Sequence, residues 1–201
     1  MHPHRSALLP AVLAAALATS GCLTTRSFTG GTLYLGGIGG PVTFDPSSAI
    51  DTVSYWDGEG VGGSPSIRIK LDEQKAYFYK GGTLVGVSMI SSGREGFGTP
   101  RGRFKIIQKE VDHRSTLYGE IYDGDGNLVN KDADITKDRI PPGGRFVGAP
   151  MPFFMRINKG IGMHTGFLPG YAASHGCIRM PDQMARRYFA NVSVGTPVTV
   201  E

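Results

Sequence analysis

Residues 65–90, PSIRIKLDEQKAYFYKGGTLVGVSMI, decide the fold class of this chain of 201 residues. Within residues 67–71, aliphatic side chains alternate with basic ones, which is the two-residue period of a β-strand with one buried face. A second apolar run at 76–79 ends near a Gly-Gly pair, and a third follows at 84–90. Two strands joined through a glycine turn form a hairpin, so this stretch predicts β-structure.

The remainder of the chain extends the same pattern. Further short strands are predicted at 103–109, 153–158, 162–165 and 197–200. Only residues 182–190 have the spacing of an amphipathic helix, with Pro181 at its start. Residues 114–148 are polar and rich in Gly and Pro, and we expect them to form a long excursion from the sheet. The expected fold class is mainly β, sandwich-like or barrel-like, with one helix near the C-terminal end.

The first residues have the pattern of an export signal. Arg5 precedes an apolar run at 7–18, and small residues then lead to Cys22. The run is shorter than the ~20 residues that span a bilayer, so we expect a signal peptide at 1–21 and no permanent transmembrane helix.

The small residues before Cys22 resemble the lipobox of bacterial lipoproteins, although Thr19 stands where Leu is usual. We expect lipidation of Cys22, with ordinary cleavage and secretion as the alternative. Leu23 in place of Asp favours the outer membrane over the inner one. The expected location is therefore periplasmic, with membrane contact through a lipid anchor only.

Glycine separates this leader from the rest of the chain. Ten of the 30 glycines fall between residues 30 and 63, so residues 22–52 are expected to form a flexible tether and residues 53–201 the domain. Tyr55 and Trp56 are expected to pack on the edge of that domain. Without residues 1–21 the chain has 20 basic and 17 acidic side chains, a net charge of +3. This charge suits an anionic wall polymer and is too small and scattered to indicate nucleic acid.

Cys177 is the strongest candidate for chemistry. The chain has two cysteines, and lipidation of Cys22 would leave Cys177 without a disulfide partner in an oxidising compartment. A small buried filler is the alternative for such a thiol. Its neighbours favour a nucleophile, because imidazoles activate thiols and both His175 and His164 are close in sequence.

Other polar motifs are expected to have structural rather than catalytic or metal-binding roles. His113 lies in a charged stretch and is expected to be a surface or loop residue. Residues 123–127, DGDGN, resemble the start of a calcium loop but lack its glycine position and flanking helices, so a turn at a hairpin tip is expected. A zinc site built from His164, His175 and Cys177 would fit by residue type, but a fourth ligand at suitable spacing is missing. We expect no metal and no other cofactor.

Residues 161–180, IGMHTGFLPGYAASHGCIRM, resemble the signature of the L,D-transpeptidase (YkuD) catalytic domain, a histidine followed by Ser-His-Gly-Cys. Residues 67–107 resemble the opening hairpin of that family. Within them, 91–93 and 99–104 are similar to its serine-glycine and Thr-Pro-x-Gly-x-Phe segments. The resemblance covers about residues 53–201.

The resemblance implies a cysteine acyltransferase that acts on peptidoglycan stem peptides. In such enzymes the thiolate attacks the carbonyl of the third, diamino residue of a tetrapeptide stem, releases D-alanine and passes the acyl group to an amine. Cys177 would be the nucleophile, and His164 would be its base, oriented by the backbone carbonyl of Thr165. Backbone N–H groups of Gly176 and Cys177, with His175 beside them, would hold the oxyanion.

The resemblance also implies contacts with substrate. Ser174 would lie in the cleft, and Arg179 would bind a stem carboxylate, with an ion pair to Asp182 as the alternative. Tyr171 and Met155 are expected to line the cleft, with a place in the core as the alternative. The resemblance does not identify the amine that accepts the acyl group. Two alternative functions also remain, an L,D-carboxypeptidase that uses water as acceptor and a non-catalytic lipoprotein that binds the wall.

Overall fold

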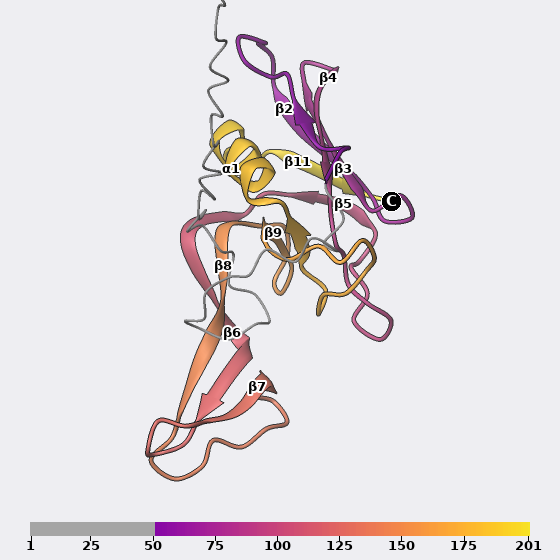
Figure 1. The fold of residues 1–201 in the computed structure, drawn as a ribbon. Coiled ribbons are helices and arrows are strands. Elements are labelled where there is room, and N and C mark those ends of the chain that lie inside the picture. The colour runs from indigo at the N-terminus through magenta and orange to yellow at the C-terminus, as the bar shows by residue number, and fades with distance from the viewer. Residues whose placement is uncertain (1–50) are drawn as a thin grey trace, which may run out of the picture.

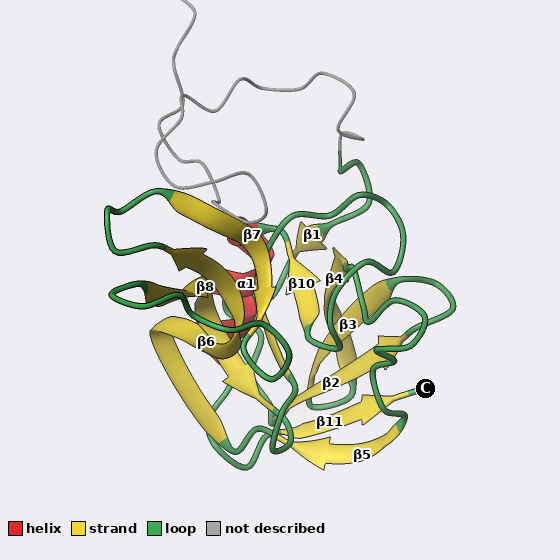
Figure 2. Ribbon diagram, turned by 90° about the horizontal axis from the view of Figure 1, so that it is seen from below, coloured by secondary structure: helices red, strands yellow, loops and turns green. Residues whose placement is uncertain are grey.

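The computed structural model describes residues 51–201, which form two β-sheets and one helix (Figures 1 and 2). This confirms a mainly β fold with one helix near the C-terminal end. The elements have these bounds: β1 Tyr55–Trp56, β2 Pro65–Lys70, β3 Lys75–Lys80, β4 Thr83–Met89, β5 Gly102–Lys105, β6 Gln108–Tyr122, β7 Leu128–Asp134, β8 Arg145–Arg156, β9 Gly162–Thr165, β10 Ile178–Met180, α1 Asp182–Asn191 and β11 Pro197–Val200.

The predicted hairpin lies within a six-stranded sheet with the order β1-β4-β3-β2-β11-β5. Ile67 of β2 is opposite Phe78 of β3, and both are buried. The C-terminal strand β11 pairs with β2 in parallel, so that Val198 is also opposite Ile67. The alternation seen in the sequence therefore places one face of this sheet in the core, as a half-buried strand requires.

The second sheet has the order β10-β9-β8-β6-β7 and contains most of the stretch expected to be an excursion. Residues 114–148 are not irregular, because they include parts of β6 and β8 and the whole of β7. These three strands form a ribbon that extends from the rest of the domain (Figure 1). Most side chains of β7 are exposed or half-buried, so the strand lacks the apolar alternation by which a sequence reveals β-structure.

The strand predicted at 103–109 is divided between two strands, because its start lies in β5 and its end in β6, and residues 106–107 pass from one sheet to the other. Ile106 donates its N–H to Thr196 beside the first sheet, and Ile107 donates its N–H to Arg156 in the second. The expected hairpin tip at 123–127 is confirmed. There the Asp123 carboxylate accepts the backbone N–H groups of Asp125 and Asn127.

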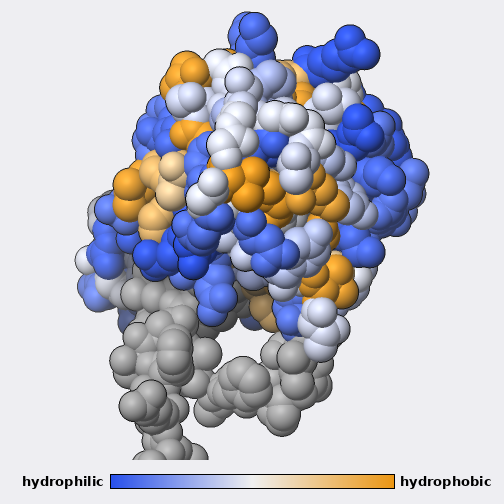
Figure 3. Space-filling view, turned by 90° about the horizontal axis from the view of Figure 1, so that it is seen from above, coloured by the Kyte–Doolittle hydropathy of each residue, from blue (hydrophilic) through white to orange (hydrophobic). Residues whose placement is uncertain are grey.

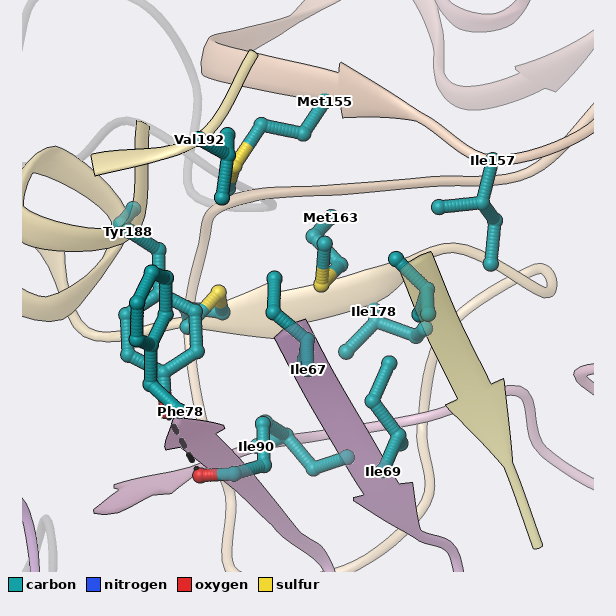
Figure 4. Packing of buried hydrophobic residues seen from close by; sticks show 14 of the residues in the cluster. Ile67, Ile69, Phe78, Ile90, Met155, Ile157, Met163, Ile178, Tyr188 and Val192 are labelled. Atoms are coloured by element: carbon teal, nitrogen blue, oxygen red, sulfur yellow. Dashed lines mark hydrogen bonds between the residues drawn. The ribbon is translucent and has the colours of Figure 1, made fainter. Parts of the chain in front are cut away.

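The core lies between the sheets and the helix, where aliphatic and methionine side chains from both sheets meet (Figure 4). Tyr188 of α1 is fully buried, and its hydroxyl donates to the Ala76 carbonyl at 2.7 Å. Trp56 packs against Phe78 with ring centroids 5.1 Å apart and against Tyr188 at 6.1 Å. The prediction that the aromatic pair at the start of the domain packs on its edge is confirmed for Trp56, which attaches β1 to the core.

The surface of the domain carries polar and apolar groups side by side. On the face in Figure 3, hydrophobic side chains form smaller groups among hydrophilic ones. Within residues 51–201, no helix combines the length and the apolar character that crossing a membrane requires. The expected signal peptide, the lipidation site at Cys22 and nearly all of the tether lie outside the described residues.

Candidate active site

The parallel pairing of β9 with β10 brings the two halves of the sequence motif together. In this register His164 of β9 is opposite Arg179 of β10, and Cys177 comes just before β10. Residues two apart in extended chain face the same side. As a result, His164, Cys177 and Arg179 all line one cleft.

His164 is buried, with 1% of its surface exposed. Its Nδ1 lies 2.7 Å from the carbonyl oxygen of Thr165. A carbonyl oxygen only accepts, so Nδ1 carries the proton and Nε2 of the neutral ring is unprotonated. Burial lowers the pKa of His164 to about 4, although the Thr165 carbonyl acts in the opposite direction. The ring is therefore neutral and able to accept a proton at neutral pH.

Cys177 is half-buried, and its Sγ lies 3.8 Å from the Gly160 carbonyl oxygen. Burial raises the pKa of the thiol, while the Gly162 backbone and the positive charge of Arg156 act to lower it. The resting cysteine is thus a thiol rather than a thiolate. A nucleophilic role would therefore require a base that removes the thiol proton.

His175 is held in a different way from His164. Its Nε2 accepts a hydrogen bond from Nη2 of Arg94 at 2.8 Å, because a guanidinium only donates. The ring stacks on Tyr118 of β6, with centroids 4.3 Å apart, and meets the edge of Phe97 at 4.8 Å. Burial and the charge of Arg94 lower the pKa of His175. A guanidinium beside Nε2 opposes protonation there, so His164 is the better-placed base.

The loop before Cys177 is ordered by the Ser174 hydroxyl. Ser174 Oγ accepts the N–H of Gly176 at 3.0 Å and donates to the carbonyl oxygen of Cys177. The Gly176 N–H is thus already bonded and is not the free oxyanion donor that we expected. Glycine suits this position for another reason, because its φ of +113° is unfavourable for residues with a side chain.

The Thr-Pro segment at 99–104 and the serine-glycine segment at 91–93 support this loop through hydrogen bonds. Thr99 Oγ1 donates to the Gly176 carbonyl at 2.8 Å and accepts the N–H of Gly93 at 2.9 Å. A Cβ on Gly93 would lie 2.0 Å from the Phe97 carbonyl oxygen, so this position requires glycine. Both segments, first noted as a resemblance, therefore support the cysteine loop structurally.

The opposite wall of the cleft comes from β6 and β8 and was largely missed from the sequence. His113 lines the cleft, stacks on Phe154 at 4.1 Å and hydrogen-bonds to Glu110. The expectation of a surface histidine was therefore wrong. The charged neighbours of His113 in sequence hid its position, because only the pairing of β6 with β8 brings it to Phe154.

Two expected substrate contacts are corrected. Met155 has no exposed surface and belongs to the core, because it alternates along β8 with Phe154 and Arg156, which face the cleft. Tyr171 is 65% exposed and does not line the cleft. Its carbonyl oxygen accepts a hydrogen bond from Ser91. Of the four residues expected to contact substrate, Ser174 and Arg179 are in the cleft.

Asp182, the expected alternative partner of Arg179, has other contacts. Its carboxylate accepts hydrogen bonds from Arg186 Nε at 2.6 Å and from Thr165 Oγ1 at 3.2 Å. These contacts connect the start of α1 to the end of β9. Within the part of the chain that the structure describes, no group of three or more His, Cys, Asp or Glu side chains is arranged to hold a metal ion.

Comparison with known proteins identifies a family and a shared fold. A family model described as the L,D-transpeptidase catalytic domain (YkuD) matches residues 64–200. Similar solved structures include an L,D-transpeptidase from Mycobacterium smegmatis, with 22% identity and a TM-score of 0.51 over 70% of this chain and 59% of that chain. An L,D-transpeptidase from Enterococcus faecium, solved as a cysteine-to-serine mutant, has 26% identity and a TM-score of 0.50 over 70% and 50%.

A third similar structure is L,D-transpeptidase 3 from Mycobacterium tuberculosis in complex with a faropenem-derived adduct. It has 22% identity and a TM-score of 0.50 over 70% of this chain and 61% of that chain. The chain thus spans half to about three-fifths of the length of these structures. The mycobacterial likenesses show a shared fold. A search of curated proteins found no match.

Proposed function

The chain belongs to the L,D-transpeptidase (YkuD) catalytic domain family, and we propose that it is a peptidoglycan L,D-transpeptidase with Cys177 as nucleophile and His164 as base. The observation that carries this proposal is the shared cleft, which is lined by a thiol and by a neutral imidazole whose proton is on Nδ1. The Thr165 carbonyl supports the role of His164, because it fixes the proton on Nδ1 and so directs proton transfer to Nε2.

The first half-reaction forms a thioester. His164 Nε2 takes the proton of the Cys177 thiol, and the sulfur attacks the carbonyl carbon of the third residue of a stem tetrapeptide. The C–N bond to D-alanine then breaks, and the leaving amine takes the proton from His164. Because burial keeps the resting pair neutral, the ion pair exists only while substrate is reacting.

The second half-reaction transfers the acyl group. An acceptor amine attacks the thioester carbonyl and gives its proton to His164, and the C–S bond breaks. The sulfur leaves as a thiolate and regains the proton from His164. This step links the stem to another amine, in the wall or on a protein.

We further propose that this chemistry takes place outside the cytoplasmic membrane. The support is the sequence pattern of residues 1–22, with its apolar run and its small residues before Cys22. A lipid on Cys22 would tether the domain to the outer membrane, within reach of peptidoglycan.

The proposal is tested by incubating the purified protein with tetrapeptide-containing muropeptides and following its intact mass. We expect release of D-alanine and a transient thioester on Cys177, both absent in Cys177→Ala. A Cys22→Ser variant is the matched control, since it removes the other cysteine and should acylate normally. No adduct and no D-alanine with any stem peptide would refute the proposed function. Hydrolysis of the adduct despite excess amine would instead indicate a carboxypeptidase.

A further inference from the structure

The cleft around Cys177 has a one-sided charge. Arg156, Lys159 and Arg179 line it, and no Asp or Glu of the described chain is among its lining residues. Elsewhere on the domain, several cations are paired with acids. Arg101 contacts Asp72 at 2.8 Å, for example. A cleft lined by one sign of charge attracts ligands of the opposite sign.

Several contacts hold the guanidinium of Arg156 in the cleft. Its guanidinium lies over the ring of Phe154 at 4.8 Å. Its Nε donates to Gln108 Oε1 at 2.6 Å, and its Nη1 donates to the Lys159 carbonyl oxygen at 3.3 Å. No hydrogen bond joins Nη2 to another described residue. These contacts already restrict the guanidinium before a ligand binds. Binding a ligand through its remaining N–H donors therefore costs little further side-chain entropy.

The nearest acid in this network does not neutralise Arg156 directly. Glu110 is reached only through the amide of Gln108, which donates to it, and the other Glu110 oxygen is bonded to His113. Arg156 forms no ion pair within residues 51–201. The positive charge of Arg156 therefore lies at the cleft and is not neutralised by a carboxylate of the described chain.

Arg156 and Lys159 line the same cleft as the reacting sulfur. The Cys177 Sγ lies 3.8 Å from the carbonyl oxygen of Gly160, the residue after Lys159. The positive charge of Arg156 favours the thiolate of Cys177. An anion bound by Arg156 would thus lie beside the bond that Cys177 attacks.

We propose that Arg156, assisted by Lys159, forms a carboxylate-binding subsite beside Cys177 that selects acyl donors with a free carboxylate next to the scissile bond. Carboxylates fit a guanidinium through paired N–H donors, which makes arginine the suitable residue. The identity of the donor rests on the proposed function, whereas the subsite is a property of the cleft and can be tested apart from it. In a stem tetrapeptide the carboxylate of the leaving residue meets this requirement, and in a longer stem that carboxylate is replaced by an amide.

The subsite is tested with two small thiol reagents of nearly equal shape, iodoacetate and iodoacetamide, on the full chain. Alkylation of Cys177 is followed by mass spectrometry of its peptide. The ratio of the two rates isolates the carboxylate, because any change in the reactivity of the thiol itself affects both reagents. We expect Arg156→Gln to lower the iodoacetate-to-iodoacetamide ratio by about tenfold or more, since hydrogen bonds to charged groups have that strength.

Matched variants separate the subsite from general effects. Arg156→Lys keeps the charge and should retain part of the ratio, and Lys159→Gln, at an exposed position, should lower it about threefold. Arg103→Gln removes an exposed arginine of β5 outside the cleft and should leave the ratio unchanged. An Arg156→Gln ratio equal to that of the wild type would overturn the proposal. If that variant does not fold, an unchanged ratio in Lys159→Gln would do so.

A second arm uses a stem tetrapeptide and its C-terminal amide as acyl donors. The wild type should prefer the acid, and Arg156→Gln should lose this preference. Equal use of both donors by the wild type would overturn donor selection. If neither donor acylates Cys177, the proposed function fails, while the alkylation ratio still decides on the subsite.

Discussion

Burial of His164 predicts a specific dependence of stability on pH. The pKa of this residue is about 4 in the folded chain and about 6.5 when unfolded. Between these values the unfolded state binds more protons, so stability is complete above pH 6.5 and is lost as the pH falls toward 4. The difference between these two pKa values corresponds to about 3 kcal/mol in full, and lowering the pH from 8 to 5 should remove about 2 kcal/mol.

This prediction is tested by urea unfolding of the wild type and His164→Gln at pH 8, 6.5 and 5. Glutamine cannot titrate, so the loss of stability between pH 8 and 5 should be smaller by about 2 kcal/mol in the variant. The comparison at pH 8, where His164 is neutral in both states, gives the cost of the substitution without any effect of protonation. A pH dependence that is the same in both proteins, within about 0.5 kcal/mol, would refute the reasoning.

Two further predictions concern the support of the site and its location. Gly93→Ala should destabilise the domain by at least about 2 kcal/mol in urea unfolding and slow acylation of Cys177, because its Cβ would overlap the Phe97 carbonyl oxygen. Gly98→Ala, whose Cβ would have no neighbour within 4 Å, should change stability by less than about 0.5 kcal/mol. Equal effects of the two changes would contradict the packing argument. Cys22→Ser should abolish palmitate labelling and release the protein from membranes, and labelling that persists would rule out Cys22 as the lipidation site.

Much of the site could be predicted because its main residues are close together in the sequence. His164 and residues 174–177 lie within fifteen positions of each other, and the strands around them are marked by apolar side chains. The pairing of β9 with β10 then follows from local β-structure. The expected bounds at 162–165 and 197–200 coincide with β9, which is buried throughout, and with β11, whose burial alternates.

The opposite wall of the cleft could not be predicted in the same way. Its position depends on the register between β6 and β8, in which residues about forty positions apart are paired. β6 is rich in polar side chains and β8 is apolar almost throughout, so no apolar alternation reveals their pairing. The same register decides that Met155 faces the core and that its neighbours Phe154 and Arg156 face the cleft.

The sequence by itself determined the fold class, the single helix, the cysteine motif and the family that it resembles, because periodicity and turn residues act locally. Only the tertiary structure decided which side chains surround Cys177. In that structure the Gly176 N–H is bonded to Ser174, His113 lines the cleft, and Arg156 lines the same cleft as Cys177. The physical reason is that burial, charge and hydrogen bonding depend on contacts between distant residues, and strand register fixes these contacts.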